Sequence, residues 1–227
     1  MQINQDKVKK AFKALFKHEN ENGEKEEIVW LMISTFENNN LVKRNPARIL
    51  LKHGCHTPGV RRCLFVRASQ QSYKDMIKEK KIKGIHKVLD LKHVRKLYHK
   101  PEAQLQLMEE FDMFLADNYT IHKLSKIFSR EVYKKRREPM PINLKAQDLQ
   151  KEVLLAAKST HMNFMKGNCY AVKIATTGQT DTAAFENFMS AYTSIAQATP
   201  GGEEAIRSLQ IKTANSVSLP IYENNEQ

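Results

Sequence analysis

Hydrophobic side chains follow two different periods along the chain, and residues 111–144 show both in succession. Phe111 to Leu115 is an apolar run of strand length, and a polar turn follows it. Apolar side chains then recur at helical spacing as far as Phe128. Pro139 and Pro141 prevent that helix from continuing. The pattern predicts a buried strand and an amphipathic helix, which together form one βα unit of a layered α/β domain.

Short strand and helix patterns alternate through residues 58–144. Cys63–Val66 and Val88–Leu91 are apolar runs of strand length, and apolar stripes at helical spacing follow each of them. Such alternation is typical of a small parallel sheet with helices on both faces. Pro58 and Gly59 mark the point where the chain enters this region.

The segments on either side contain longer elements. Residues 6–17 place apolar side chains on one helical stripe with lysines opposite, which predicts an N-terminal helix docked on a core. Ile28–Phe36 predicts a well-covered strand. Neither segment is complete alone. We therefore expect a discontinuous α+β domain, residues 1–57 and 145–227, that is interrupted by an inserted three-layer α/β domain, residues 58–144.

Charge is distributed unevenly along the 227 residues. The formal net charge is +12 and the isoelectric point is about 9.5. Residues 58–144 hold 20 Lys and Arg against 10 Asp and Glu, whereas the rest of the chain holds 17 against 15. A solvated lysine surface that favours solubility would give the same total, but an excess within one segment is what binding to a phosphate backbone requires. The charge pattern therefore favours a nucleic acid as partner.

Several classes of protein are not indicated. No apolar run approaches the roughly 20 residues that span a bilayer, and the first residues lack the apolar stretch of a secretion signal, so we expect no membrane partner and no export. Three cysteines without CxxC spacing fit a reducing compartment. His53, Cys55, His56 and Cys63 are zinc-ligand types in an unfamiliar spacing, and no catalytic or nucleotide-binding motif is present. We expect no enzyme activity, no cofactor and no metal.

Two stretches carry a resemblance to a known family. FDMFLADNYTIHKLSKIFSREVYKKRREPMPINL at 111–144 resembles the middle of a ribosomal protein L1 domain, and IKTANSVSLPIY at 211–222 resembles its C-terminal part. Both are more similar to the nucleolar branch of L1-domain proteins in ribosome biogenesis than to the ribosomal protein, whose glycine-rich segment near this point is absent. The resemblance covers about residues 25 to 222 and implies the same two-domain fold.

The resemblance also implies a set of RNA-contacting residues. In the ribosomal protein, RNA is contacted by the first strand, by the loop after the strand here at 170–176, and by a Ser-Thr-Met-Gly loop after the last strand. The last loop falls on residues 213–216, where only Thr213 matches in type and serine replaces glycine. A Phe–Thr–Glu pattern of the first strand falls near Lys25, Ile28 and Trp30 and is lost. With the basic segment that follows the helix, the expected RNA-binding residues are Lys173, Thr176, Thr177, Gly178, Lys212, Thr213, Ala214, Asn215, Ser216, Lys134, Lys135, Arg136 and Arg137.

Each group of these residues also has a purely structural interpretation. Lys173 alternates with Val172 and Ile174, so it lies on the opposite strand face, where it either contacts RNA or solvates an exposed sheet. Asn215 and Ser216 either contact RNA or form a turn before the SLPIY segment. The basic clusters neutralise phosphates without reading sequence and do not distinguish RNA from DNA.

Three functions from different classes compete. The first is a nucleolar, and hence nuclear, ribosome-assembly factor that binds precursor ribosomal RNA through both domains, acts beside other pre-ribosomal assembly factors and is a monomer when free. The second is a mature large-subunit ribosomal protein of the L1 family, against which the altered loop and the missing glycine-rich segment count. The third is a protein-binding adaptor that uses the N-terminal helix or tail. Steep salt dependence of binding would favour the first over the third. An enzyme acting on a small molecule is a distant fourth.

Overall fold

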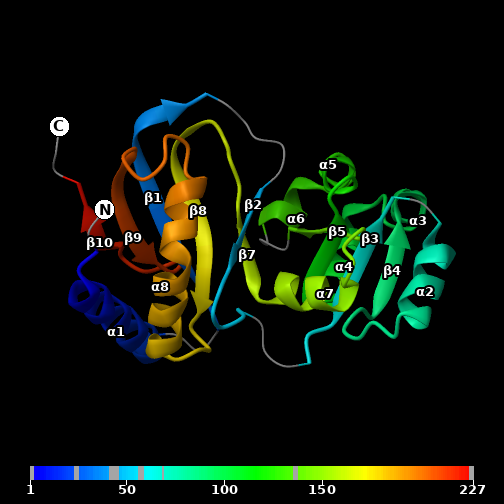
Figure 1. Ribbon diagram of the computed structural model, residues 1–227, viewed down its shortest axis with the longest axis horizontal. Helices are drawn as coiled ribbons and strands as arrows, with labels where there is room; N and C mark the ends of the chain where they lie inside the picture. The colour runs from blue at the N-terminus through cyan, green and yellow to red at the C-terminus, as the bar shows by residue number, and fades with distance from the viewer. Residues whose placement is uncertain are drawn as a thin grey trace. The chain divides into compact units, whose positions relative to one another are not determined.

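The computed structural model describes residues 3–22, 26–40, 46–55, 59–67, 69–134 and 138–224, and the chain divides into two compact units (Figure 1). Unit 1 comprises residues 1–55 and 158–227, and unit 2 comprises residues 56–157. Unit 1 contains an antiparallel sheet and unit 2 a parallel one. The expected fold class, a discontinuous α+β domain with an inserted α/β domain, is confirmed.

Strand β1 (Ile28–Asn39) is a central strand of the unit 1 sheet. Val29, Leu31 and Ile33 are buried, and the residues between them are half-buried, so only one face of the strand enters the core. The strand order is β10-β9-β1-β8-β7-β2. The other strands are β2 (Ala47–Leu50), β7 (Ser159–Met162), β8 (Gly167–Thr176), β9 (Ile206–Lys212) and β10 (Leu219–Glu223).

Helices α1 (Gln5–Asn22) and α8 (Asp181–Ala198) cover the inward face of this sheet (Figure 1). The apolar stripe of α1 is buried, and the ring of Phe12 lies 6.2 Å from that of Phe188 on α8. Thr180 begins α8 because its hydroxyl accepts a hydrogen bond from the backbone amide of Ala183. Within the part of the chain that the structure describes, no helix is long and apolar enough to cross a membrane.

Unit 2 consists of three layers. Its parallel sheet has the order β4 (Lys87–Asp90), β3 (Arg62–Val66), β5 (Met113–Asp117), β6 (Met140–Ile142). The strands are nearly continuous apolar runs because both faces of the sheet are covered. One face carries α2 (Gln70–Glu79) and α7 (Leu149–Ala157), and the other carries α3 (Leu91–Leu97), α4 (Pro101–Glu110), α5 (Ile121–Leu124) and α6 (Arg130–Lys134).

Helix α7 packs with unit 2. Leu149 and Val153 lie in the same core cluster as Leu64 and Met140, on the face of the sheet that α2 also covers. The spacing of apolar residues over 145–157 resembles that of the outer segments and predicts that these residues belong to the discontinuous domain. The apolar stripe predicts the helix but carries no information on which core it joins, and the compact units separate near Lys158.

The helix expected over residues 121–128 is interrupted. Gln104 of α4 is 1% exposed, and its side-chain amide donates a hydrogen bond of 3.1 Å to the carbonyl oxygen of Ile127. The backbone amide of Ser129 in turn donates to the Gln104 side-chain oxygen at 2.8 Å. These bonds satisfy backbone groups that an interruption would otherwise leave without partners. The α-helix ends at Leu124, and turns continue the chain to Phe128, whose ring lies in the same core cluster as Leu124. The helical period therefore predicted the buried face correctly, and Gln104 binds the backbone where the turns end.

Asp90, at the end of β4, gives a testable prediction about stability. Burial alone would raise the pKa of its carboxyl, but hydrogen bonds from the backbone and ring of His93 and from the Gln70 amide outweigh burial and lower the pKa. The carboxylate also caps α3, so Asp90→Ala should lower the free energy of unfolding by about 1–2 kcal/mol at neutral pH. Urea unfolding of both proteins measures this difference.

The same variant should show a defined pH dependence. A carboxyl whose pKa is lower in the folded protein stabilises the fold fully at pH values above its pKa in the unfolded chain, which is about 3.9. This stabilisation is lost as the pH falls through the pKa of the carboxyl in the folded protein. The advantage of the wild type over Asp90→Ala should therefore shrink below about pH 4. Asp75→Ala, on the exposed surface of α2, is the matched control and should change little. If the difference in unfolding free energy between the wild type and Asp90→Ala stays constant down to the lowest pH at which both proteins are folded, the charge of Asp90 does not stabilise the fold.

Candidate nucleic-acid interface

Two connections of unit 1 meet at one end of its sheet because of the strand directions. β8 and β9 both run antiparallel to β1 and pair with its opposite edges. Thr176 therefore pairs with Ile28, and Lys212 pairs with Trp30, so the chain leaves β8 and β9 beside the start of β1. We call residues 176–179 the β8 turn and residues 213–218 the β9 loop.

Glu27, which precedes β1, joins the β8 turn to the β9 loop. Its backbone amide donates a 2.8 Å hydrogen bond to the Thr177 hydroxyl, and its carbonyl accepts one of 2.9 Å from the Thr177 amide. Its carboxylate accepts a 2.9 Å bond from the side-chain amide of Asn215. The second carboxylate oxygen, Oε2, is buried and has no hydrogen-bond partner among the described residues. Glu27 thus fixes both connections, and its Oε2 atom is enclosed by the protein.

Thr213 closes the β9 loop from inside. The residue is fully buried, and its hydroxyl donates to a carboxylate oxygen of Glu19 on α1 at 3.0 Å. The same hydroxyl accepts from the Ser216 amide at 3.1 Å, while the Thr213 amide donates to the Ser216 hydroxyl at 2.9 Å. Thr213 therefore orders the loop and does not face solvent, whereas Ala214 and Asn215 are exposed at its tip.

The β8 turn, like the β9 loop, contains both buried residues that hold its shape and residues that are exposed to solvent. Thr176 is buried, and its backbone amide donates to the side-chain oxygen of Gln179. Thr177 is half-buried and bound to Glu27, and Gly178 is exposed. A methyl group added at Gly178 would lie 3.0 Å from the carboxyl group of Glu26. The absent side chain therefore lets Glu26 approach the turn closely.

Two lysines stand beside these connections on the outward face of the sheet. Val172 and Ile174 are buried in the core, and Lys173 between them is half-buried on the other face. Lys173 and Lys212 are both paired with Trp30, one from each neighbouring strand. Cross-strand partners lie on the same face of a sheet, so Trp30 has an ammonium-bearing side chain on each side.

The end of unit 1 thus mixes charges instead of presenting cations alone. Glu19, Glu26 and Glu27 contribute carboxylates among the hydroxyls, the amide of Asn215 and the nearby lysines. Carboxylates repel phosphates but accept hydrogen bonds from hydroxyl and amino groups. Such a surface suits the 2′-hydroxyls and base edges of a folded RNA better than the phosphate backbone alone.

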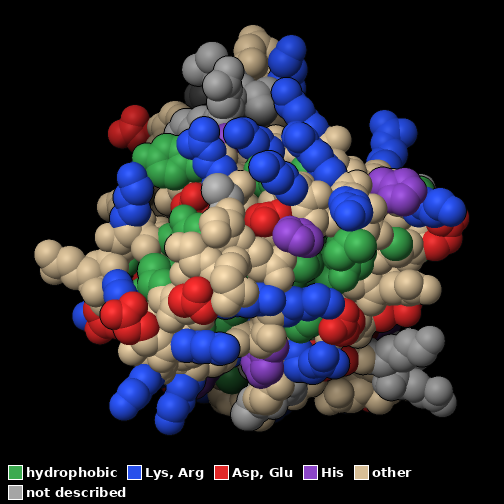
Figure 2. All heavy atoms as spheres, turned by 90° about the vertical axis from the view of Figure 1, so that its right-hand side faces the viewer, with side chains coloured by type: hydrophobic (Ala, Val, Ile, Leu, Met, Phe, Trp, Pro, Cys, Tyr) green, Lys and Arg blue, Asp and Glu red, His purple; other side chains and the backbone are tan. Residues whose placement is uncertain are grey.

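Unit 2 carries the excess positive charge. Residues 56–157 hold 22 Lys and Arg against 12 Asp and Glu. Helix α3 presents Lys92, Arg95 and Lys96 to solvent with no acidic residue among them, and Figure 2 shows Lys and Arg side chains spread over this side of the unit. This surface has the composition needed to neutralise phosphates. Further exposed cations of the unit include Lys78, Lys80, Lys81, Lys83 and Lys100.

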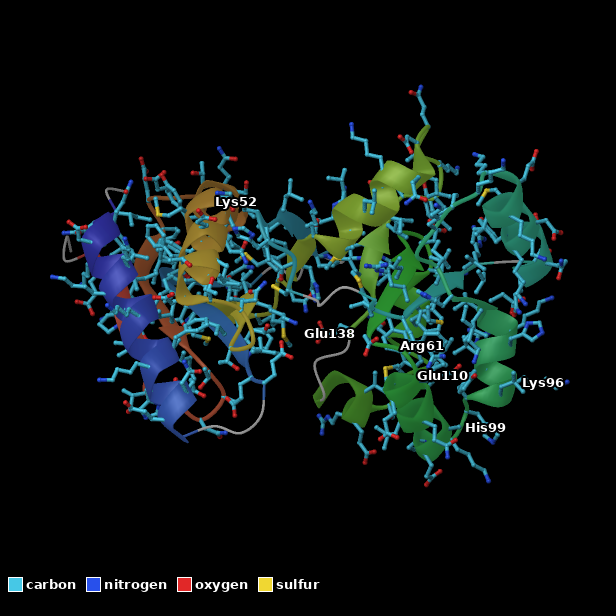
Figure 3. The ribbon with its side chains drawn as sticks, turned by 90° about the horizontal axis from the view of Figure 1, so that it is seen from below. Lys52, Arg61, Lys96, His99, Glu110 and Glu138 are labelled. Atoms are coloured by element: carbon cyan, nitrogen blue, oxygen red, sulfur yellow. The ribbon has the colours of Figure 1, made fainter. Side chains whose placement is uncertain are left out.

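Two cations of unit 2 are instead held by its structure. Arg61 lies 3.6 Å and Lys87 lies 3.0 Å from the carboxylate of Glu110 (Figure 3). Both also lie over the ring of Phe111, at 5.1 Å and 5.3 Å from its centre. Glu110 therefore offsets one of these two positive charges at the start of the parallel strands. Lys87 does not share the surroundings of the α3 cations, which have no acidic residue among them.

The basic segment after α6 is described only in part. Lys134 is the last residue of α6, and Lys135, Arg136 and Arg137 lie outside the described residues. All four belong to unit 2, whereas the other expected RNA-binding residues belong to unit 1. The structure thus brings nine of the expected residues to one end of one sheet and assigns the remaining four to a separate unit.

Three of the four residues of zinc-ligand type, His53, Cys55 and Cys63, are described by the structure. Cys55 lies in the core of unit 1 and Cys63 in the core of unit 2, and burial raises the pKa of their thiols to about 11 and about 12. Burial therefore disfavours the thiolate, which is the form that ligates a metal. His53 contacts Glu186 of α8 instead, and His56 lies outside the described residues. Among the described residues, no three His, Cys, Asp or Glu side chains gather to hold a metal.

Sequence reasoning missed Glu27 and Glu19. The Phe–Thr–Glu pattern of the ribosomal protein falls near Ile28 and Trp30 and is lost there, so it did not point to the residues before the strand. The acidic run Glu26–Glu27 directly before β1 was a usable signal, because a residue that precedes a central strand lies beside the connections of its antiparallel neighbours. Glu19 gave no such signal, because its contact with Thr213 depends on how α1 docks.

Comparison with known proteins identifies similar chains. The model of the ribosomal protein L1p/L10e family matches residues 13–217. A Schizosaccharomyces pombe protein named for ribosome biogenesis is 30% identical over 205 residues, which cover 87% of this chain and 55% of that protein. Ribosomal L1 domain-containing protein 1 of Mus musculus is 25% identical over 238 residues, which cover 98% of this chain and 52% of that protein.

A second Schizosaccharomyces pombe protein named for ribosome biogenesis is 26% identical over 225 residues, which cover 95% of this chain and 78% of that protein. This chain spans about half the length of the first two relatives. Because each match covers 87% or more of this chain, all three include residues of both units.

The order of the β9 loop can be tested through Thr213. Thr213→Val preserves the shape of the side chain but removes the hydroxyl that binds Glu19 and the Ser216 amide. We expect the variant to lose about 1–3 kcal/mol of stability, because buried groups of the loop lose their partner. Hydrogen exchange should become faster at the Ser216 amide. Thr182→Val at the exposed start of α8 is the control, and equal exchange at Ser216 in both variants would show that Thr213 does not order the loop.

Proposed function

Because the chain belongs to the ribosomal protein L1p/L10e family, we propose that it binds precursor ribosomal RNA as a ribosome-assembly factor. It would act in pre-ribosomal particles in the nucleolus, beside other assembly factors. The proposed role is binding, so it requires no cofactor and no chemical step.

The observation that carries this proposal is the joining of the β8 turn and the β9 loop by Glu27. Specific recognition needs polar groups that are held in place before the RNA arrives, since their ordering then costs no further entropy on binding. Hydrogen bonds fix Thr177, Asn215 and Glu27 to one another. The exposed side chain of Asn215 can accept a hydrogen bond through its amide oxygen from a 2′-hydroxyl, which RNA has and DNA lacks.

A role in assembly is favoured over a role as a mature ribosomal protein. Two of the similar proteins are named for ribosome biogenesis. The β9 loop also has Asn215 and Ser216 at positions where the ribosomal protein has Met and Gly, so a backbone approach that requires glycine is lost. Sedimentation of the full-length protein separates the two roles. An assembly factor sediments with pre-ribosomal particles, whereas a structural protein sediments with polysomes.

The protein-binding adaptor is less well supported. That hypothesis uses the N-terminal helix or the tail, and a helix that binds a partner commonly does so through its apolar face. Val8, Phe12, Leu15 and Phe16 are buried in the core of unit 1, so the stripe is occupied by the chain itself.

We propose that the two units contribute differently to RNA binding. The excess charge of unit 2 provides affinity for any phosphate backbone, and the fixed polar groups of unit 1 distinguish one folded RNA from another. Substitutions in unit 2 should therefore weaken binding to every RNA, whereas substitutions in unit 1 should reduce the preference for one RNA over another.

Removing cations from α3 should flatten the salt dependence of RNA binding. In the variant, Lys92, Arg95 and Lys96 are replaced by glutamine. If all three contact phosphates of a duplex, the slope of log affinity against log salt should fall by about 2–3 units. The control replaces Lys9, Lys10 and Lys13 of α1 by glutamine, which removes the same charge from unit 1. Equal effects in both proteins would mean that only total charge matters, and an unchanged slope for the α3 variant would mean that its cations are merely solvated.

Changing unit 1 should reduce discrimination instead. Lys173→Ala combined with Asn215→Ala removes one ammonium and one amide of the candidate interface. Affinity is compared on a precursor fragment recovered by crosslinking the full-length protein to RNA in cells and on an unrelated duplex of equal length. The recovered fragment should lose more, by at least the roughly 1 kcal/mol of a lost hydrogen bond, which is about fivefold in affinity. Equal losses on both RNAs would place specificity elsewhere.

A further inference from the structure

The sheet of unit 1 has one face that its helices do not cover. The core residues of β1, β8 and β9 point towards α1 and α8. The residues that alternate with them point away, and the two helices of unit 1 that the structure describes both pack on the inward face. The outward face is therefore formed by side chains of the strands themselves.

Trp30 lies on this outward face near the start of β1. It is the single tryptophan of the chain and is half-buried. The strand register pairs it with Lys212 of β9 on one side and with Lys173 of β8 on the other. A bulge between Val29 and Trp30 in the pairing with β8 puts Lys173, and not Ile174, opposite Trp30. The result is a row of lysine, tryptophan and lysine across three strands.

The next row along the strands is different. Met32 is paired with Gln210 on β9 and with Ala171 on β8, so this row carries no charge. Two of the three cations of the central strands therefore flank the indole, and the third, Arg207, lies at the other end of β9. An aromatic ring between two flexible cations combines the two features that bind single-stranded nucleic acid, a surface for base stacking and positive charge for the backbone.

We propose that Trp30 stacks on an unpaired base of the RNA, while Lys173 and Lys212 contact the phosphates on either side of that nucleotide. This inference rests on the proposed function, because it takes RNA as the ligand, and it adds that the ligand presents a single-stranded nucleotide at this face. A base within a duplex has neighbours on both of its faces and offers no surface to an indole, so a loop, a bulge or a strand end is required.

The single tryptophan makes the proposal directly measurable in the full-length protein. The probes are a fluorescently labelled single-stranded RNA of about ten nucleotides and the duplex formed with its complement. Binding of each probe is followed by the anisotropy of the label, and the environment of Trp30 is followed by its own emission. We expect the single strand to quench the tryptophan emission at saturation and the duplex to leave it nearly unchanged. Both probes should bind, because the cations of unit 2 attract either one.

Substitution provides an independent readout. Trp30→Leu keeps an apolar side chain but removes the aromatic ring, so it should weaken binding of the single strand at least about fivefold and leave the duplex unaffected. Phe36→Leu is the matched control, because Phe36 is an exposed aromatic residue of the same strand that is not part of the lysine row. This control should bind both probes like the wild type.

Several results would overturn the proposal while the proposed function stands. These are saturating binding of the single strand without a change in emission, equal quenching by the single strand and the duplex, or equal affinity of the wild type and Trp30→Leu for the single strand. Emission from the wild type decides the matter even if the Trp30→Leu protein does not fold. Failure of every RNA, including precursor fragments, to bind the wild type would instead reject the proposed function itself.

Discussion

Pairing of β1 along both of its edges is the constraint on which the candidate interface depends. Because β8 and β9 run antiparallel to it, their ends arrive on either side of Glu27, and their lysines arrive on either side of Trp30. A slip of one residue would exchange the inward and outward sets and place Trp30 among the helices. The burial of Val29, Leu31 and Ile33 against α1 and α8 prevents such a slip. The hydrophobic core therefore fixes the positions of polar groups that lie outside it.

The carboxylates of unit 1 explain why charge alone is a poor guide to its role. Net charge identified unit 2 as the basic part of the chain, and α3 indeed presents cations without acidic neighbours. Unit 1 has almost balanced charge, yet its polar groups are the ones that hydrogen bonds hold in place. A mobile lysine responds to any phosphate, whereas a fixed amide or carboxylate responds to geometry. Affinity and selectivity can thus reside in different units of one chain.

The sequence allowed the fold class and most elements to be predicted, because period and turn chemistry are local properties. It did not allow the partner of α7 to be predicted, since an apolar stripe does not specify which core it joins. The backbone where the turns after Thr120 end is bound by Gln104, which lies far from it in sequence. For the candidate interface, alternation correctly placed Lys173 on the outward face. The role of Thr213 was not predictable, because a hydroxyl that contacts RNA and one that binds Glu19 from inside look the same in sequence.

The buried position of Thr213 changes how the resemblance to the L1 family should be understood. At the one position of the Ser-Thr-Met-Gly loop where the residue type agrees, the threonine hydroxyl is used inside the protein to hold Ser216 and Glu19. What this chain shares with the family at that point is then the scaffold that shapes the loop, while the residues at its tip, Ala214 and Asn215, are its own. A fixed loop with a different tip keeps its preorganisation and changes the groups that it presents. Under the function proposed above, the same fold can therefore bind a different RNA segment without any change in its core.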